Sequence, residues 1–180
     1  MANYKKLKKE LLSNQNKINQ NTNNAVVHIN INDTSDIISP YAEDNKAVIN
    51  SEFASFLENA VKDEPLKSDL TLKITAKDCN LNTVSGAIKN YYYKEFIDTQ
   101  HKLKHNITAS IITLIIGLIA LTATIILNNL SIPIIIGGTI DIFAWVFVWE
   151  SVDLFFFRRS ELKRIEYRQI NFINATIIYK

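Results

Sequence analysis

The chain has 180 residues, with 20 lysines and arginines against 18 aspartates and glutamates, and a net charge of +2. This balance argues against a chain that binds nucleic acid or an acidic partner through its overall charge. A single cysteine, Cys79, excludes an internal disulfide and agrees with a reducing cytosolic environment.

Residues 1–24 are predicted to form a flexible basic and polar tail. Four of the first ten residues are lysines, and a polar Asn/Gln stretch follows where a secretory signal would have its apolar segment. The three leucines among residues 1–24 offer too little apolar surface to offset the entropy lost when the tail becomes ordered. The alternative is a short basic helix that touches anionic lipid headgroups.

Residues 25–81 are predicted to form a small cytosolic domain of the α/β (α+β) class. Apolar and polar residues alternate over residues 26–31, which predicts a strand with one buried face, and a loop follows over residues 33–44. An apolar stripe over residues 51–61 predicts a helix, which Pro65 ends. Alternation over residues 70–77 predicts a second strand that pairs with the first.

A long helix is predicted to begin at Asn82 or Thr83 and to run without interruption into the membrane. No proline occurs between this point and Pro133. Residues 82–106 would then form a stalk helix that is continuous with the first membrane span. A movement of the domain would reach the membrane through this stalk.

Residues 107–157 are predicted to form a two-helix transmembrane hairpin. The apolar runs 107–127 and 132–157 are each long enough to cross the hydrocarbon, which takes about 20 helical residues. Only residues 128–131 separate them, and basic residues flank the outer ends of both runs. By the positive-inside rule, both termini lie in the cytoplasm and the protein resides in the inner (cell) membrane.

Small residues recur on one face of the first span, where they would let another helix approach closely. This face packs against the second span or a neighbouring subunit, or its threonine hydroxyls line a pore. The residues are Ala109, Thr113, Gly117, Ala120 and Thr124.

Asp141 is the acid that the second span carries near the bilayer midplane. A carboxylate at this depth costs about 2.5 to 3.5 kcal/mol to insert, so it usually faces a polar partner, a bundle interior or a water-filled path. It shares a helical face with Gly137, Ala144, Val148 and Ser151. Since neither span contains a basic residue, Asp141 is either neutral and packed or hydrogen-bonded, or it lines an ion pathway in an oligomer.

The cytoplasmic end of the second span is rich in charged and aromatic residues. Glu150 and Asp153 either pair with the basic residues at this boundary or form a cation-attracting inner mouth. The predicted interface anchors are Trp145, Trp149, Arg158 and Arg159. Residues 158–180 are predicted to form a cytosolic helix, followed by a strand over residues 175–179 that returns to the sheet of the domain.

The residues of known catalytic and cofactor motifs are missing. No glycine-rich phosphate loop is present, and one cysteine with three histidines makes a structural zinc site unexpected. We therefore expect no catalytic residue, no bound metal and no cofactor, and the chain is not expected to be an enzyme.

The segment Trp-x-x-x-Trp-Glu-x-x-Asp-x-Phe-Phe-Phe at residues 145–157, followed by two arginines and a terminal β segment, resembles small two-span bacterial membrane proteins of uncharacterised function. The layout is also similar to membrane effectors of nucleotide-signalled antiphage operons of the Hailong and CBASS kind. The second resemblance implies a soluble sensing part, for a nucleotide or protein ligand, ahead of a channel-forming part.

Two functions follow from these features. The first is a homo-oligomeric membrane effector in which the cytosolic domain senses a ligand or partner and the spans conduct ions around Asp141. The second is a non-conducting anchor that presents the small domain to a protein partner. Membrane lipid is the expected contact of the hairpin in both, and nothing in the sequence points to nucleic acid.

Overall fold

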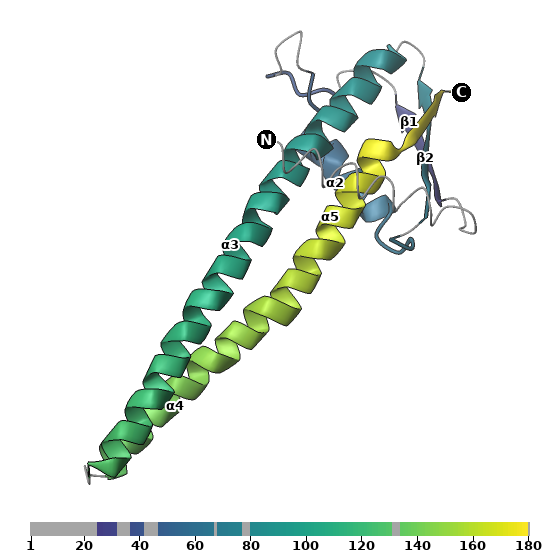
Figure 1. Ribbon diagram of the computed structural model, residues 1–180. Coiled ribbons are helices and arrows are strands. Elements are labelled where there is room, and N and C mark those ends of the chain that lie inside the picture. Colours follow the sequence, from purple (N-terminus) through teal and green to yellow (C-terminus); the bar gives the residue numbers. More distant parts are fainter. Residues whose placement is uncertain are drawn as a thin grey trace. The chain divides into compact units, whose positions relative to one another are not determined.

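The computed structural model describes residues 25–31, 37–41, 47–66, 68–76, 80–130 and 134–179 (Figure 1). The predicted tail over residues 1–24 lies outside these ranges, as do parts of the predicted loop over residues 33–44 and Ser131 of the predicted turn. The chain divides into two compact units. The first, the sheet unit, consists of Met1–Phe96 and Tyr167–Lys180, and the second, the helical unit, consists of Ile97–Glu166.

The sheet unit is built on three parallel strands in the order β1-β2-β3. They are β1 (Ala25–Ile31), β2 (Leu70–Ala76) and β3 (Thr176–Tyr179). In the central register, Val27 lies opposite Leu72, and Leu72 lies opposite Ile177. The predicted pairing of the first two strands and the predicted third strand from the end of the chain are both confirmed.

One face of the sheet carries the core of this unit. Alternate residues of β1, from Ala25 to Ile31, are buried, and the residues between them are exposed. This alternation follows from the period of two in a strand, which sends successive side chains to opposite faces. The buried face packs against helical residues, among them Leu57, Val84, Ile88 and Phe172.

Helix α2 (Ser51–Ala60) lies between β1 and β2 in the chain, as the apolar stripe predicted. Its start is fixed by Asn50, whose side-chain Oδ1 accepts a hydrogen bond from the Phe53 backbone N–H at 2.7 Å. This N-cap satisfies one of the backbone donors that a helix leaves unpaired at its first turn. The segment before it forms an isolated antiparallel bridge between Ile38 and Ile49.

The end of helix α5 (Arg159–Asn174) holds the loop that follows α2. Arg168 Nη2 donates to the Lys62 carbonyl at 2.8 Å, and Asn171 Nδ2 donates to the Leu66 carbonyl at 2.9 Å. Phe172 stacks on Tyr92 of α3, with ring centroids 4.1 Å apart and planes 6° apart. These contacts tie the last helical turns and β3 into the core.

Helix α3 (Leu81–Asn129) is a single helix of 49 residues and therefore about 73 Å long. Its continuity confirms the prediction of an unbroken helix. By length and composition, its segment Asn82–Leu127 can cross a membrane. Only 17% of an 18-residue apolar stretch within this segment is buried. The chain then forms α4 (Ile134–Val152), a π-helix η2 (Asp153–Arg158) and α5.

Candidate functional site: the face between α3 and α4

The face of α3 that packs within the helical unit repeats at alternating spacings of three and four residues. This spacing keeps one seam of a helix turned toward a neighbouring helix. The seam positions are buried or half-buried, and most positions between them are exposed. They are Leu103, Asn106, Ser110, Thr113, Gly117, Ala120 and Thr124. Four of these belong to the predicted small-residue face, and the half-buried Ala109 lies beside the seam.

The matching face of α4 consists of the stripe that contains Asp141. Gly137, Ala144 and Ser151 are buried, and Asp141 and Val148 are half-buried. Their spacings of four, three, four and three residues are those of the α3 seam. The structure therefore places these five residues along one face of α4.

At Gly117, α3 lies directly against the backbone of α4. A Cβ atom at this position would lie 2.9 Å from Val148 Cγ2, 3.1 Å from the Val148 backbone nitrogen and 3.3 Å from the Ala144 carbonyl oxygen. Two of these three neighbours are backbone atoms, which cannot move aside without separating the helices. Glycine is therefore required here for the observed packing.

Two serines join the helices by reciprocal hydrogen bonds. Ser110 Oγ donates to the Ser151 carbonyl at 3.0 Å, and Ser151 Oγ donates to the Ser110 carbonyl at 2.9 Å. One turn earlier on α3, Asn106 Nδ2 donates to the Leu154 carbonyl at 2.6 Å. These polar side chains are buried and satisfied within the helix pair, a pattern that suits a low-dielectric surrounding.

Asp141 lies at the edge of this seam. Ser110 faces Ser151 and Gly117 faces Ala144, so the antiparallel register places Asp141 level with Ala120. Among the described residues, its carboxyl group makes no hydrogen bond or ion pair. Among the described residues, a carboxyl group at this depth in a predicted span is therefore left without a partner.

The seam threonines, the predicted candidates for a pore wall, bond to their own helix. Thr113 Oγ1 donates to the Ala109 carbonyl at 2.7 Å, and Thr124 Oγ1 donates to the Ala120 carbonyl at 3.1 Å. Because each hydroxyl donates its proton to the preceding turn, these side chains add little unsatisfied polarity to the seam.

Glu150 and Asp153 are both exposed. Within the described part of the chain, neither forms an ion pair with Arg158 or Arg159. Arg159 instead has its guanidinium carbon 5.3 Å from the centre of the Phe155 ring. Trp145 and Trp149, the predicted anchors, are 61% and 68% exposed.

The π-helix η2 lies between two stretches of helix, and each stretch has buried residues. Before it, Ser151 is buried; after it, Glu166 is 1% exposed and accepts hydrogen bonds from Gln100 and, at 2.8 Å, from Lys163 Nζ. A π-turn accommodates more residues than an α-turn, so it changes the rotational phase of the residues that follow. The wide turn therefore brings the Glu166 side of α5 toward α3.

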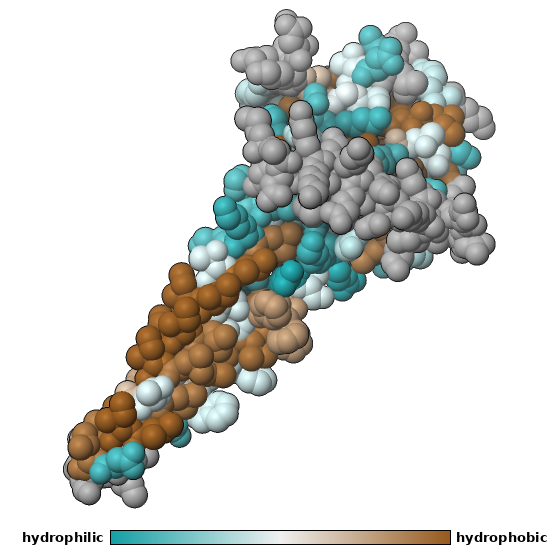
Figure 2. Space-filling view, in the orientation of Figure 1, coloured by the Kyte–Doolittle hydropathy of each residue, from teal (hydrophilic) through white to brown (hydrophobic). Residues whose placement is uncertain are grey.

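The outer surface of the helical unit is predominantly apolar (Figure 2). Large side chains that belong in a core are exposed along both helices, and an apolar surface of this extent is unusual on a soluble monomer. Exposed apolar residues include Ile111, Ile115, Leu118, Ile119, Ile125 and Ile126 on α3 and Ile135, Ile142, Phe143 and Val146 on α4.

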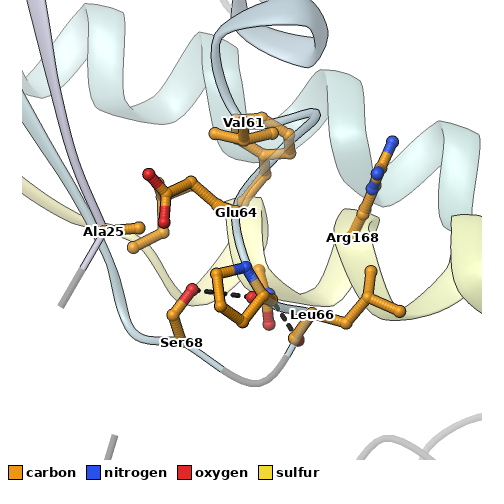
Figure 3. A pocket seen from close by; sticks show the side chains of 10 residues that line it. Ala25, Val61, Glu64, Leu66, Ser68 and Arg168 are labelled. Carbon is orange, nitrogen blue, oxygen red and sulfur yellow. Dashed lines mark hydrogen bonds between the residues drawn. The ribbon is translucent and has the colours of Figure 1, made fainter. Parts of the chain in front are cut away.

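The sheet unit contains a small pocket between the loop after α2 and the end of α5 (Figure 3). Its volume of about 20 Å³ can hold a water-sized molecule and no nucleotide. Ser68 Oγ donates to the Pro65 carbonyl at 2.7 Å, so this side chain is already satisfied. The pocket therefore offers no binding site for the predicted nucleotide ligand in this conformation.

Charged side chains of three helices interact on the sheet unit near Tyr92. The pKa of Glu58 is raised because burial disfavours its charged form and because Glu95 adds a second negative charge, while Arg168 acts in the opposite direction. Burial also raises the pKa of Tyr92, whose hydroxyl group has no hydrogen-bond partner among the described residues. No group of three or more potential metal ligands occurs in the described ranges.

The described residues thus define a mostly helical protein with a small three-stranded parallel sheet and one helix long and apolar enough to cross a membrane. Comparisons with protein-family models, curated proteins and solved structures found no match to this chain.

Proposed function

We propose that the chain is an integral membrane effector in which α3 and α4 form a two-helix hairpin across the inner membrane and the sheet unit lies in the cytoplasm. The observation that carries this proposal is the distribution of polarity in the helical unit. Small and polar side chains are satisfied between the helices, and large apolar side chains cover the outside. Lipid supplies the apolar contact that this outer surface needs.

The effector role rests on the continuity of the helices and on Asp141. Helix α3 runs unbroken from Leu81 to Asn129, so a ligand or protein partner that changes the sheet unit has a direct mechanical route to the span. A single hairpin cannot enclose a pore. Conduction therefore requires a homo-oligomer in which several copies of Asp141 surround water. A role in antiphage defence is the biological setting that the sequence resemblance suggests.

Membrane insertion is tested first. Full-length protein should stay in the membrane fraction after carbonate extraction. In a Cys79→Ser background, a cysteine at Leu130 should react with an impermeant maleimide from outside, and one at Ile178 only from inside. Extraction by carbonate would contradict the hairpin. It would also be contradicted if the cysteine at Leu130 reacted only from inside or the cysteine at Ile178 reacted from outside.

Conduction is tested by potassium flux from proteoliposomes that contain wild-type protein or Asp141→Asn. Loss of the carboxylate should reduce the flux at least about tenfold, because the charge that attracts cations is removed while the side-chain volume stays the same. Thr122→Val is the matched control, since this exposed threonine bonds to the Leu118 carbonyl of its own helix at 2.8 Å. If neither wild-type protein nor Asp141→Asn produces potassium flux under any condition, the channel hypothesis is contradicted.

A non-conducting anchor is the second candidate, and the placement of the Asp141 stripe favours it. Gly137, Ala144 and Ser151 are buried against the neighbouring helix, so the stripe has a packing role in the single chain. Subunit stoichiometry separates the two functions. Crosslinking in native membranes that yields a ring of four or more copies favours conduction, and a monomer or dimer favours the anchor.

A further inference from the structure

The outer edge of α4 beside Asp141 carries three residues, an exposed glycine, an acid and a tryptophan, for which the described residues supply no contacting partner group. Gly138 is exposed, and a Cβ atom there would meet no atom within 4 Å, so the backbone forms an open notch. Asp141 is half-buried, and Trp145 is 61% exposed. At about 100° per residue, these three residues lie within an arc of roughly 60° on α4.

Trp145, predicted from the sequence as an interface anchor, lies near the middle of the predicted span over residues 132–157, a position that favours a different role. It precedes Arg158 by 13 residues, or roughly 20 Å of helix, whereas tryptophans that anchor a protein at the headgroups lie near the ends of a span. Among the described residues, its indole N–H has no hydrogen-bond partner. In hydrocarbon, this donor and the Asp141 carboxyl group each need a partner.

We infer that Gly138, Asp141 and Trp145 form a self-association surface, and that the indole N–H of Trp145 in one copy donates to the Asp141 carboxyl group of a second copy. The inference rests on the proposed function, because it requires that the copies share one orientation in a bilayer. A surface that carries both a donor and an acceptor is complementary to itself, as a twofold contact between two identical chains requires.

The geometry of parallel helices favours this pairing. Around a symmetry axis along the membrane normal, residues with the same number lie at the same depth. Helical side chains lean toward the N-terminus of their helix, so the Trp145 side chain points toward the level of residue 141, about 6 Å away. The Gly138 notch lets the neighbouring helix come close enough for this contact.

The test uses the full-length chain in liposomes, with self-association measured by energy transfer between labelled copies as lipid is added. Trp145→Phe, which keeps an aromatic ring and removes the N–H, should weaken association roughly tenfold for two symmetric bonds. Trp149→Phe is the control, because it makes the same change on the same side of α4 about 12 Å from Asp141. It should weaken association less than about twofold.

Asp141→Leu should match Trp145→Phe, and the double variant should be no weaker than either single variant, since all remove the same bond. Gly138→Leu should also weaken association, and its open surroundings in the single chain leave the fold intact. Wild-type protein that is monomeric at every lipid ratio, or equal effects of Trp145→Phe and Trp149→Phe, would overturn the inference.

The outcomes distinguish this inference from the proposed function. If the chain resists carbonate extraction but remains monomeric, the membrane hairpin is supported and the self-association surface is contradicted. If the chain is extracted by carbonate, the proposed membrane function is contradicted.

Discussion

The two units of this chain bury opposite kinds of surface. In the sheet unit, large apolar residues such as Leu72 and Phe172 fill the interior, and the exposed residues of β1 are mostly polar. In the helical unit, serine, asparagine and glycine occupy the contact between the helices, and isoleucine and phenylalanine cover the outside. The comparison shows that one sequence can encode two packing rules, one with a mostly apolar interior and the other with a mostly apolar exterior.

The same leucine truncation in the two units tests this difference most strongly. Leu72 is fully buried in the central strand, so Leu72→Ala should lower the free energy of unfolding of the sheet unit by about 2 to 5 kcal/mol. Leu118 is 51% exposed on α3, and Leu118→Ala should change the stability of the helix pair by less than about 1 kcal/mol. Denaturant titration monitored by circular dichroism gives both values, and equal losses would contradict the comparison.

A second test compares two glycines of the helix pair. Gly117→Leu should destabilise the α3–α4 contact by about 1 to 3 kcal/mol, because the side chain would meet backbone atoms of α4. Gly138→Leu, at a position with open surroundings, should leave the contact unchanged. The measurement is unfolding in mixed detergent micelles dilute enough to keep the chain monomeric. A loss for Gly138→Leu equal to that for Gly117→Leu would show that the close approach at Gly117 is not the cause.

The serine pair provides a smaller and more specific effect. Ser110→Ala should cost about 1 kcal/mol, because one interhelical hydrogen bond disappears and the Ser151 carbonyl loses its donor. The hydroxyl oxygens are 3.3 Å apart, so the losses for Ser110→Ala and Ser151→Ala should not add in the double variant. Additive losses within about 0.3 kcal/mol would indicate two independent bonds.

The smallest expected effect is a pH dependence of the sheet unit. Glu58 has a pKa above its ordinary value of 4.5 in the folded chain, so the folded state binds this proton more readily than the unfolded state. Stability therefore falls as pH rises from about 4.5 through the folded pKa, and the loss is complete above it. Glu58→Gln should remove this part of the pH dependence in urea titrations at several pH values. Glu95→Gln should reduce it, because the second negative charge is gone.

Periodicity was sufficient to predict most of the secondary structure. The alternation over residues 26–31 and 70–77, the stripe over residues 51–61 and the absence of proline before Pro133 correspond to β1, β2, α2 and the unbroken α3. These signals are local, and each can be recognised in a window of a few residues. The parallel direction of the strands and the cap at Asn50 were not predicted, because they depend on how distant segments meet.

The candidate site could be predicted only in part, because its partners are far apart in the sequence. The stripe through Asp141 follows from helical spacing alone. The serine bond joins residues 41 positions apart, and the Gln100–Glu166 contact joins residues 66 positions apart. The available signal was the alternating spacing of three and four residues from Leu103 to Thr124, which includes Ser110 in place of Ala109. The π-helix η2 has no such local signal. It depends on how the buried faces of α4 and α5, on its two sides, must be rotated relative to each other.

The position of β3 imposes an order on biosynthesis. Its partner β2 ends at Ala76, and Thr176 follows only after α3, α4 and α5 have been translated. One edge of the central strand therefore stays open while about a hundred residues, including both long apolar helices, leave the ribosome. Because β3 follows both helices in the chain, the three-stranded sheet can be completed only after both helices have been synthesised.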